Sequence, residues 1–272
     1  MNTDTKILFT DLDDTLLTSS KEISQTNLSA IDRLLEAGHK FVFNTGRPIQ
    51  SALPLAIKYN FVKPGFYISS FNGGLIYDCY EKKTIHKVTV PVETIKYMFD
   101  KAYEKGLHCH TYTREYVIAE HETEALKFYS RRIQVPYKVV EDIVSYLPEE
   151  PIKCIVMSLT SRQELMTFEQ EMLPFTTGRL SSTFSNDMML EYANPQTTKG
   201  EAVRFLCQYF DIPIENSYAC GDEENDLTMI QSAGCGVVMK NGVASIKPYA
   251  DYITERDNDH DGITEVIEKF FL

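Results

Sequence analysis

The chain of 272 residues is long enough for one large domain or two modest ones, and its 43% hydrophobic and 24% charged residues are ordinary globular composition. A net charge of −12 with no basic run to offset it argues against a nucleic-acid or anionic-membrane partner. The six cysteines are scattered and include no C-x-x-C pair, which favours reduced thiols. The sequence shows no signal-peptide pattern, and no apolar stretch approaches the roughly 20 residues of a bilayer helix. Together these observations favour a cytoplasmic protein.

The first 82 residues alternate between the patterns of strand and helix. Residues 6–12 (KILFTDL) form a short apolar run, as a buried strand of a parallel sheet does. Helices are predicted over residues 24–38 and 48–60, and strands over residues 39–46 and 65–78. The last of these segments turns at Asn72-Gly73-Gly74, so it is predicted to be a pair of strands.

Residues 83–192 show a different pattern, in which strand-like runs such as residues 83–90 alternate with helical segments. This mixture favours an α+β domain with a largely antiparallel sheet. After it, the chain returns to alternation, with helices predicted over residues 199–211, 225–234 and 262–272 and strands over 217–222 and 235–239. The sequence therefore predicts an α/β fold: a doubly wound, Rossmann-like parallel-sheet core built from residues 1–82 and 193–272, with an inserted α+β cap domain at residues 83–192.

Polar and charged residues gather where the predicted core strands end. Two aspartates follow the first strand, and a threonine and a glycine follow the second. An acidic run follows a later strand, and the helix before that strand begins with a lysine. These residues are Asp11, Asp13, Thr45, Gly46, Lys199, Asp222, Asn225 and Asp226. Because the carboxyl ends of parallel strands converge at one edge of the sheet, we expect them to meet in one crevice.

Several carboxylates in one crevice repel one another unless a divalent cation neutralises them. No pair of histidines or cysteines stands near these motifs, so the ligands are oxygens, which suits Mg²⁺, and Mg²⁺ in turn favours a phosphate ligand. The Thr45 hydroxyl, the N–H groups beside Gly46 and the Lys199 ammonium could hold phosphoryl oxygens. One aspartate there could attack phosphorus, and another could act as general acid and base.

Four ordered motifs carry a family resemblance. DLDDT at residues 11–15, NTGR at 44–47, Lys199 in TTKGEA and GDEEND at 221–226 resemble the motifs of the haloacid dehalogenase superfamily of phosphotransferases. The long insertion between the second and third motifs resembles the type IIB cap of the Cof-like sugar-phosphate phosphatases. The segments NGGLIYD, VVMKNGVASIKPYADYIT and DNDHDGI are similar to that subfamily as well. The resemblance covers both halves of the core, whereas the cap matches by position and layout.

The resemblance implies roles for individual residues. Asp11 would be the nucleophile and Asp13 the general acid and base. The phosphoryl group would be bound by Thr45, Lys199 and Asn225, and Mg²⁺ by Asp11, Asp222 and the backbone carbonyl of Asp13, with Asp226 supporting Lys199 or the metal shell. An acid at position 13 points to phosphate-ester hydrolysis, because the ion-pumping and dehalogenating members of the superfamily lack one there.

Several residues keep two interpretations. Asn72, at an Asn-Gly turn, either binds substrate or only shapes the turn, and Asn241 and Asn258 are treated in the same way. Arg47 either lines the crevice or lies on the surface, and Asn225 and Asp226 could be a helix cap. His108 and His110 alternate on one strand face, but no third metal ligand is visible. In the insertion, the residues that could contact substrate or simply pack are Tyr112, Arg114, Tyr116, Arg131 and Arg132.

These observations favour a Mg²⁺-dependent phosphatase that hydrolyses small phosphate monoesters, either sugar phosphates or a phosphorylated cofactor, through an aspartyl-phosphate. The partner would be a small-molecule phosphate ester, with neither nucleic acid nor membrane involved. Two alternatives stay open: a sugar phosphomutase of the same superfamily, and a non-catalytic ligand-binding regulatory protein on this fold. A phospho-acceptor receiver domain is excluded by the length of the chain and by its insertion.

Overall fold

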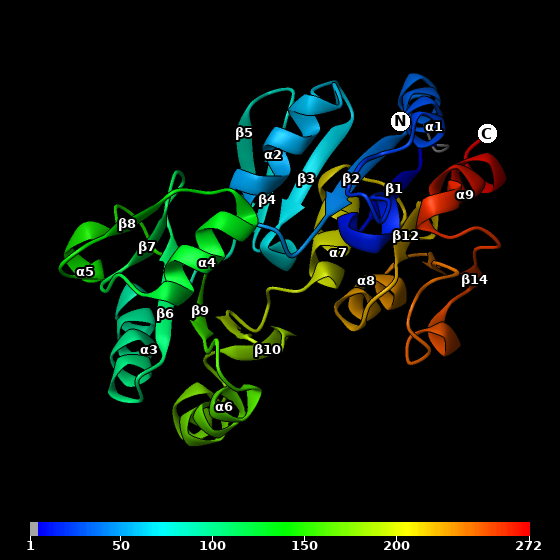
Figure 1. The fold of residues 1–272 in the computed structure, drawn as a ribbon. Helices are drawn as coiled ribbons and strands as arrows, with labels where there is room; N and C mark the ends of the chain where they lie inside the picture. The colour runs from blue at the N-terminus through cyan, green and yellow to red at the C-terminus, as the bar shows by residue number, and fades with distance from the viewer. Residues whose placement is uncertain (1–4) are drawn as a thin grey trace. The chain divides into compact units, whose positions relative to one another are not determined.

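The computed structural model describes residues 5–272, which form two compact units (Figure 1). The first unit comprises the chain up to His86 together with Thr198–Leu272, and the second comprises Lys87–Thr197. The second unit is thus inserted into the first, with junctions four or five residues later than the bounds expected from the sequence. No helix of the described residues is long and apolar enough to cross a membrane.

The first unit is built on an eight-stranded sheet in the order β14-β13-β12-β1-β2-β3-β4-β5. The strands are β1 (Ile7–Thr10), β2 (Lys40–Asn44), β3 (Phe66–Ser70), β4 (Leu75–Asp78), β5 (Lys83–Lys87), β12 (Ser217–Gly221), β13 (Cys235–Val238) and β14 (Tyr252–Ile253). From β14 to β3 all neighbours are parallel, and β4 runs antiparallel to β3. The central strand β1 is buried along its whole length, which fits its apolar run Ile7–Phe9.

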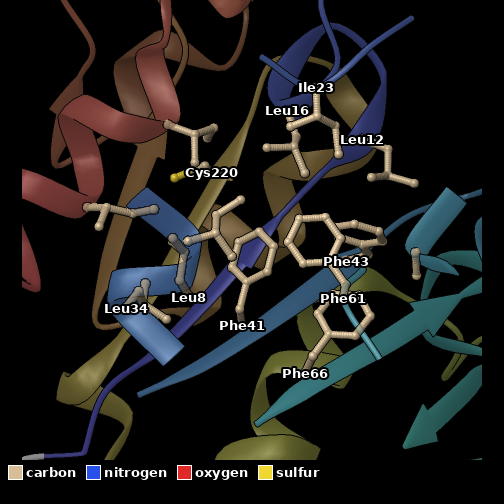
Figure 2. Close-up of a cluster of buried hydrophobic side chains, with 14 of the residues drawn as sticks. Leu8, Leu12, Leu16, Ile23, Leu34, Phe41, Phe43, Phe61, Phe66 and Cys220 are labelled. Atoms are coloured by element: carbon tan, nitrogen blue, oxygen red, sulfur yellow. The ribbon is translucent and has the colours of Figure 1, made fainter. Parts of the chain in front are cut away.

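Helices cover both faces of this sheet, as the doubly wound prediction requires. They are α1 (Gln25–Glu36), α2 (Ile49–Lys58), α7 (Lys199–Tyr209), α8 (Leu227–Ser232) and α9 (Gly262–Phe270). Alternate residues of β1 enter different clusters: Leu8 packs with residues of α1, α2 and α9, whereas Ile7 and Phe9 pack with residues of α7. Figure 2 shows the first cluster, where Phe41 and Phe43 of β2 lie among other aromatic rings. The predicted fold class is confirmed.

The second unit holds a six-stranded sheet in the order β10-β11-β9-β6-β7-β8. Its strands are β6 (His108–Tyr112), β7 (Val117–Ala119), β8 (Tyr137–Val139), β9 (Lys153–Met157), β10 (Ser181–Asn186) and β11 (Met189–Ala193), and its helices are α3 (Val92–Glu104), α4 (Glu124–Ile133), α5 (Ile143–Tyr146) and α6 (Arg162–Thr176). The pairs are antiparallel except β7 with β8. Apolar residues of α3 and α6 pack with those of β9 and β11 in one core.

One strand lies in a different sheet from the one expected. Residues 83–90 were predicted to belong to the insertion, but β5 is the edge strand of the core sheet beside β4. A short turn, with Lys82 at a φ of 54°, brings the chain straight back from β4. The residues of β5 are exposed or half-buried, and such a pattern fits an edge strand of either sheet.

Candidate active site

The chain changes direction sharply after β1. The N–H of Asp11 still donates to the carbonyl of Cys220 on β12 (3.0 Å), so this residue continues the sheet pairing. Leu12–Leu16 then forms a wide turn in which Asp14 has a φ of 57°. Leu12 and Leu16 are buried in the core and anchor this turn. Asp11 is consequently held at the buried end of β1, whereas Asp13 is only half-buried.

Lys199 lies between two carboxylates. Its Nζ is 2.6 Å from Oδ1 of Asp11 and 2.5 Å from Oδ1 of Asp226, and its side chain has no exposed surface. Burial lowers the pKa of Lys199, but the two carboxylates outweigh it and raise the pKa above its ordinary value. The ammonium is therefore permanent at neutral pH, and the sequence-predicted residues from β1, α7 and the turn before α8 are brought together.

Asp11, Asp222 and Asp226 form an acidic cluster. Each offers a carboxylate oxygen within 4.8 Å of the others, and all three residues are buried. Asp226 accepts the backbone N–H groups of Asp222 (2.9 Å) and Glu223 (3.0 Å), and Oδ1 of Asp222 accepts the hydroxyl of Thr15 (2.6 Å). These hydrogen bonds hold the carboxylates of Asp222 and Asp226 in position.

The electrostatics of the cluster favour a bound cation. Burial raises the pKa of Asp11 to about 7, against the opposing effect of Lys199, and burial also raises the pKa of Asp222 to about 8. Neighbouring carboxylates add to both shifts. Groups that resist ionisation in this way become good ligands once a divalent cation compensates their charge. The donor set is entirely oxygen, so the residues present fit Mg²⁺.

A second group of residues comes from the loops after β2 and β3. The hydroxyl of Thr45 accepts the N–H of Arg47 (3.1 Å), and the carbonyl of Thr45 accepts the N–H of Asn72 (2.9 Å). A Cβ at Gly46 would lie 3.1 Å from Oδ1 of Asn72, so a larger residue would crowd that side chain. Asn72 has a φ of 55°, and its Oδ1 is buried without a hydrogen-bond partner among the described residues. A strained turn thus carries an unsatisfied acceptor beside the Thr45 loop.

Arg47 binds Asp13 through two hydrogen bonds. Its Nε and one terminal nitrogen each lie 2.7 Å from a different carboxylate oxygen of Asp13. Burial alone would raise the pKa of Asp13, but Arg47, assisted by Lys21, lowers it below its ordinary value. Arg47 therefore belongs to this site. The sequence does not determine its place, because nothing in NTGR shows which carboxylate the guanidinium meets.

Comparison with known proteins identifies the family. A model of the haloacid dehalogenase-like hydrolases matches residues 8–267. The chain belongs to this family. A 5-amino-6-(5-phospho-D-ribitylamino)uracil phosphatase of Bacillus subtilis is 26% identical, over 100% of this chain and 99% of the relative. The predicted family and enzyme class, a haloacid dehalogenase-like phosphatase, are confirmed.

Solved structures agree with the family. A haloacid dehalogenase-like hydrolase from Bacteroides thetaiotaomicron is 29% identical, with a TM-score of 0.90 over 98% of this chain and 100% of that chain. A haloacid dehalogenase subclass IIB sugar phosphatase has the same fold, with a TM-score of 0.80 and 23% identity over 98% and 99% of the two chains. The similarity to these structures therefore covers both the core and the insertion of this hydrolase.

Three asparagines of the hydrolase differ in their surroundings. Nδ2 of Asn241 donates to the carbonyl of Asp14 (2.7 Å), and Nδ2 of Asn258 donates to the carbonyl of Leu17 (3.0 Å). Both side chains thus hold the segment that follows Asp11. Asn225 lies exposed on the turn before α8, and its role stays a prediction. Sequence patterns show the turn but give no sign of such backbone contacts.

The candidate residues of the inserted unit differ in their exposure and contacts. Tyr112 is buried, and its hydroxyl bonds that of Tyr129 on α4. Nε2 of His108 lies 3.1 Å from Nδ1 of His110, which accounts for these two nitrogens without a metal. Arg114 is exposed in the loop between β6 and β7. Among the described residues, the one set of three or more potential metal ligands is the acidic cluster.

Proposed function

We propose that this hydrolase is a Mg²⁺-dependent phosphatase that acts on small phosphate monoesters through an aspartyl-phosphate. The observation that carries the proposal is the contact of the Lys199 ammonium with Asp11, next to the acidic cluster. A buried carboxylate, a fixed cation and a set of oxygen ligands meet there at the ends of parallel strands. This is the arrangement that transfer of a phosphoryl group to a carboxylate requires.

The carboxylates of Asp11, Asp222 and Asp226 would hold Mg²⁺, with the backbone carbonyl of Asp13 as a further ligand. When bound, the metal would neutralise these carboxylates and draw charge from the phosphoryl oxygens. Thr45, the N–H beside Gly46, Lys199, Asn72 and Asn225 would bind the phosphoryl group. The buried Oδ1 of Asn72 is an acceptor, as the phosphoryl oxygens are, so Asn72 would bind them through the Nδ2 of its amide.

Asp11 and Asp13 would share the chemistry. An Oδ of Asp11 forms a bond to phosphorus as the bond to the ester oxygen breaks, and Asp13 gives a proton to that leaving oxygen. A water molecule then attacks phosphorus, Asp13 takes a proton from it, and the bond to Asp11 breaks to release phosphate. Arg47 lowers the pKa of Asp13 and so favours its ionised form, which is the form that accepts a proton in the second step. An arriving phosphate dianion would compete for Arg47 and so ease protonation of Asp13 for the first step.

The leaving group would be selected by the inserted unit, Lys87–Thr197. The core residues account for the phosphoryl group but offer little to recognise an organic group. The relative named above acts on a substrate that combines a polyol chain with a flat ring, and the subclass IIB neighbour is a sugar phosphatase. These names support a substrate that is a sugar phosphate or a phosphorylated cofactor. The six free cysteines agree with a cytoplasmic location, which is part of the proposal.

A phosphate-release screen tests this function. Purified protein would be assayed on sugar phosphates, flavin mononucleotide, pyridoxal phosphate and nucleotides, with Mg²⁺, with EDTA and with Ca²⁺. We expect hydrolysis with Mg²⁺, none with EDTA and little with Ca²⁺, because Ca²⁺ takes more ligands at longer distances. Full activity after exhaustive chelation would contradict the metal requirement. A requirement for a sugar bisphosphate activator would instead identify a phosphomutase.

A further inference from the structure

Asn44, the last residue of β2, joins two parts of the core that are far apart in sequence. It is fully buried and stands next to Thr45. Its Nδ2 donates to the backbone carbonyl of Lys199 (3.0 Å) and contacts Sδ of Met229 (3.4 Å), while its Oδ1 accepts the hydroxyl of Ser69 (2.8 Å). The end of β2 is therefore tied to the first residue of α7.

The direction of this amide is determined by its partners. A backbone carbonyl can only accept, so the nitrogen of Asn44 must face Lys199. The hydroxyl of Ser69 can donate, and it does so to the remaining oxygen. An aspartate of the same shape would keep the second bond and lose the first. The site thus distinguishes an amide from a carboxylate at position 44.

The backbone around Lys199 is held on further sides. A Cβ at Gly73 would lie 2.5 Å from the carbonyl of Thr198, and one at Gly200 would lie 2.5 Å from the carbonyl of Thr228. Both glycines mark a close approach of two backbones. The hydroxyl of Thr198 also caps α7 by accepting the N–H of Glu201 (3.1 Å). Asn44 supplies the side-chain hydrogen bond to the Lys199 carbonyl in this arrangement.

We infer that Asn44 is a positioning residue: by holding the backbone of Lys199, it sets the ammonium at its 2.6 Å contact with Asp11. The inference rests on the proposed function of Lys199 in binding the phosphoryl group. Lysine has a long flexible stem, so an ammonium is placed accurately only when the main chain is fixed as well. A displacement of about 1 Å at a reacting centre can lower the rate by roughly 100-fold.

A double-mutant cycle between Asn44→Asp and Lys199→Ala tests the inference. Asn44→Asp alone should lower kcat/KM by about 10- to 100-fold. In the Lys199→Ala background it should change kcat/KM by less than about 3-fold, because the group that Asn44 positions is gone. Met229→Leu is the matched control: it removes the sulfur contact at similar volume, and its kcat/KM should stay near that of wild type.

Two further measurements separate the possible outcomes. Thermal unfolding defines a temperature at which every variant is folded, and if Asn44→Asp does not fold, Ser69→Ala takes its place in the cycle with a smaller loss expected. Binding of inorganic phosphate in the presence of Mg²⁺, measured by calorimetry, should show the same non-additivity without turnover. If wild type binds phosphate but hydrolyses no ester, the proposed function fails, and the cycle is still decided on phosphate affinity. Equal losses from Asn44→Asp with and without Lys199 would overturn the inference.

Discussion

Arg47 holds Asp13 by both oxygens of its carboxylate, at 2.7 Å each. The guanidinium comes from the loop after β2 and the carboxylate from the turn after β1, so neighbouring parallel strands supply the two partners. Lys21 approaches the same carboxylate at 3.2 Å but is largely exposed. A two-point contact fixes the orientation of a carboxylate in a way that a single ammonium does not. Arg47 thus determines where Asp13 points.

Replacing Arg47 should therefore affect esters with poor leaving groups most. We expect Arg47→Ala to lower kcat/KM for an alkyl phosphate by roughly 100-fold and for p-nitrophenyl phosphate by roughly 10-fold or less, because an aryl oxide departs with little help from a proton donor. Arg47→Lys should fall between Arg47→Ala and wild type, since it keeps the charge and loses the two-point contact. Steady-state kinetics on the two esters would measure this. Equal losses on both would show that Arg47 acts on the phosphoryl group instead.

The two aspartates should respond differently to the same change. Asp11→Asn should abolish turnover, because a neutral amide is a far weaker nucleophile and a poorer metal ligand. Asp13→Asn should slow turnover by roughly 10²- to 10⁴-fold and leave Mg²⁺ affinity nearly unchanged, since its proposed metal contact is through the backbone. Phosphate release and calorimetric Mg²⁺ titration would measure the two effects. Substantial phosphatase activity in purified Asp11→Asn protein would rule out the proposed nucleophile.

Much of this site follows from motif position alone. Asp11, Lys199 and the acidic run were expected to converge because each follows, or lies next to, the carboxyl end of a parallel strand, and the structure brings Asp11, Lys199 and Asp226 into contact. The parallel core sheet follows from the alternation of strands and helices. A coarse property of the chain, its order of elements, thus determines which motifs meet.

The contacts that depend on side-chain direction were not predictable. The pairing of Arg47 with Asp13 requires the geometry of the wide turn after β1, which no pattern in DLDDT shows. Asn44 looks like an ordinary strand residue, and its contact with Lys199 spans 155 positions of the chain. The sequence also does not show which sheet β5 joins, because a half-exposed strand fits the edge of either sheet.

The acidic cluster should make the metal-free protein less stable as pH rises. The pKa values of Asp11 and Asp222, about 7 and about 8 in the fold, lie above the value of about 3.9 expected in the unfolded chain. Between about pH 4 and pH 8 the folded state therefore holds more protons than the unfolded state, so the free energy of unfolding falls with rising pH. Thermal unfolding in EDTA across this range should show a falling Tm, less steep in Asp222→Asn.

Mg²⁺ should reverse this dependence, because it binds the ionised carboxylates of the folded state alone. The rise in Tm on adding Mg²⁺ should be larger at pH 8 than at pH 5, where protons compete for the same oxygens. Asp32→Asn offers a control, since Asp32 pairs with Lys63 at the surface and should leave the profile unchanged. A Tm that rises between pH 5 and pH 8 in EDTA, both in wild type and in Asp222→Asn, would show that the cluster does not govern stability.

Selectivity among esters should depend on the inserted unit, and phosphate binding on the core. Arg114 is exposed, so Arg114→Ala removes a cation without disturbing packing, whereas Tyr112 is buried and is better tested as Tyr112→Phe, which removes the hydroxyl alone. We expect either variant to change the order of kcat/KM among sugar phosphates, flavin mononucleotide and pyridoxal phosphate. Lys199→Ala should lower all of them by a similar factor, because every ester carries the same phosphoryl group. If the variants of the inserted unit lowered every ester equally while Lys199→Ala changed the order, the proposed division between the two units would be wrong.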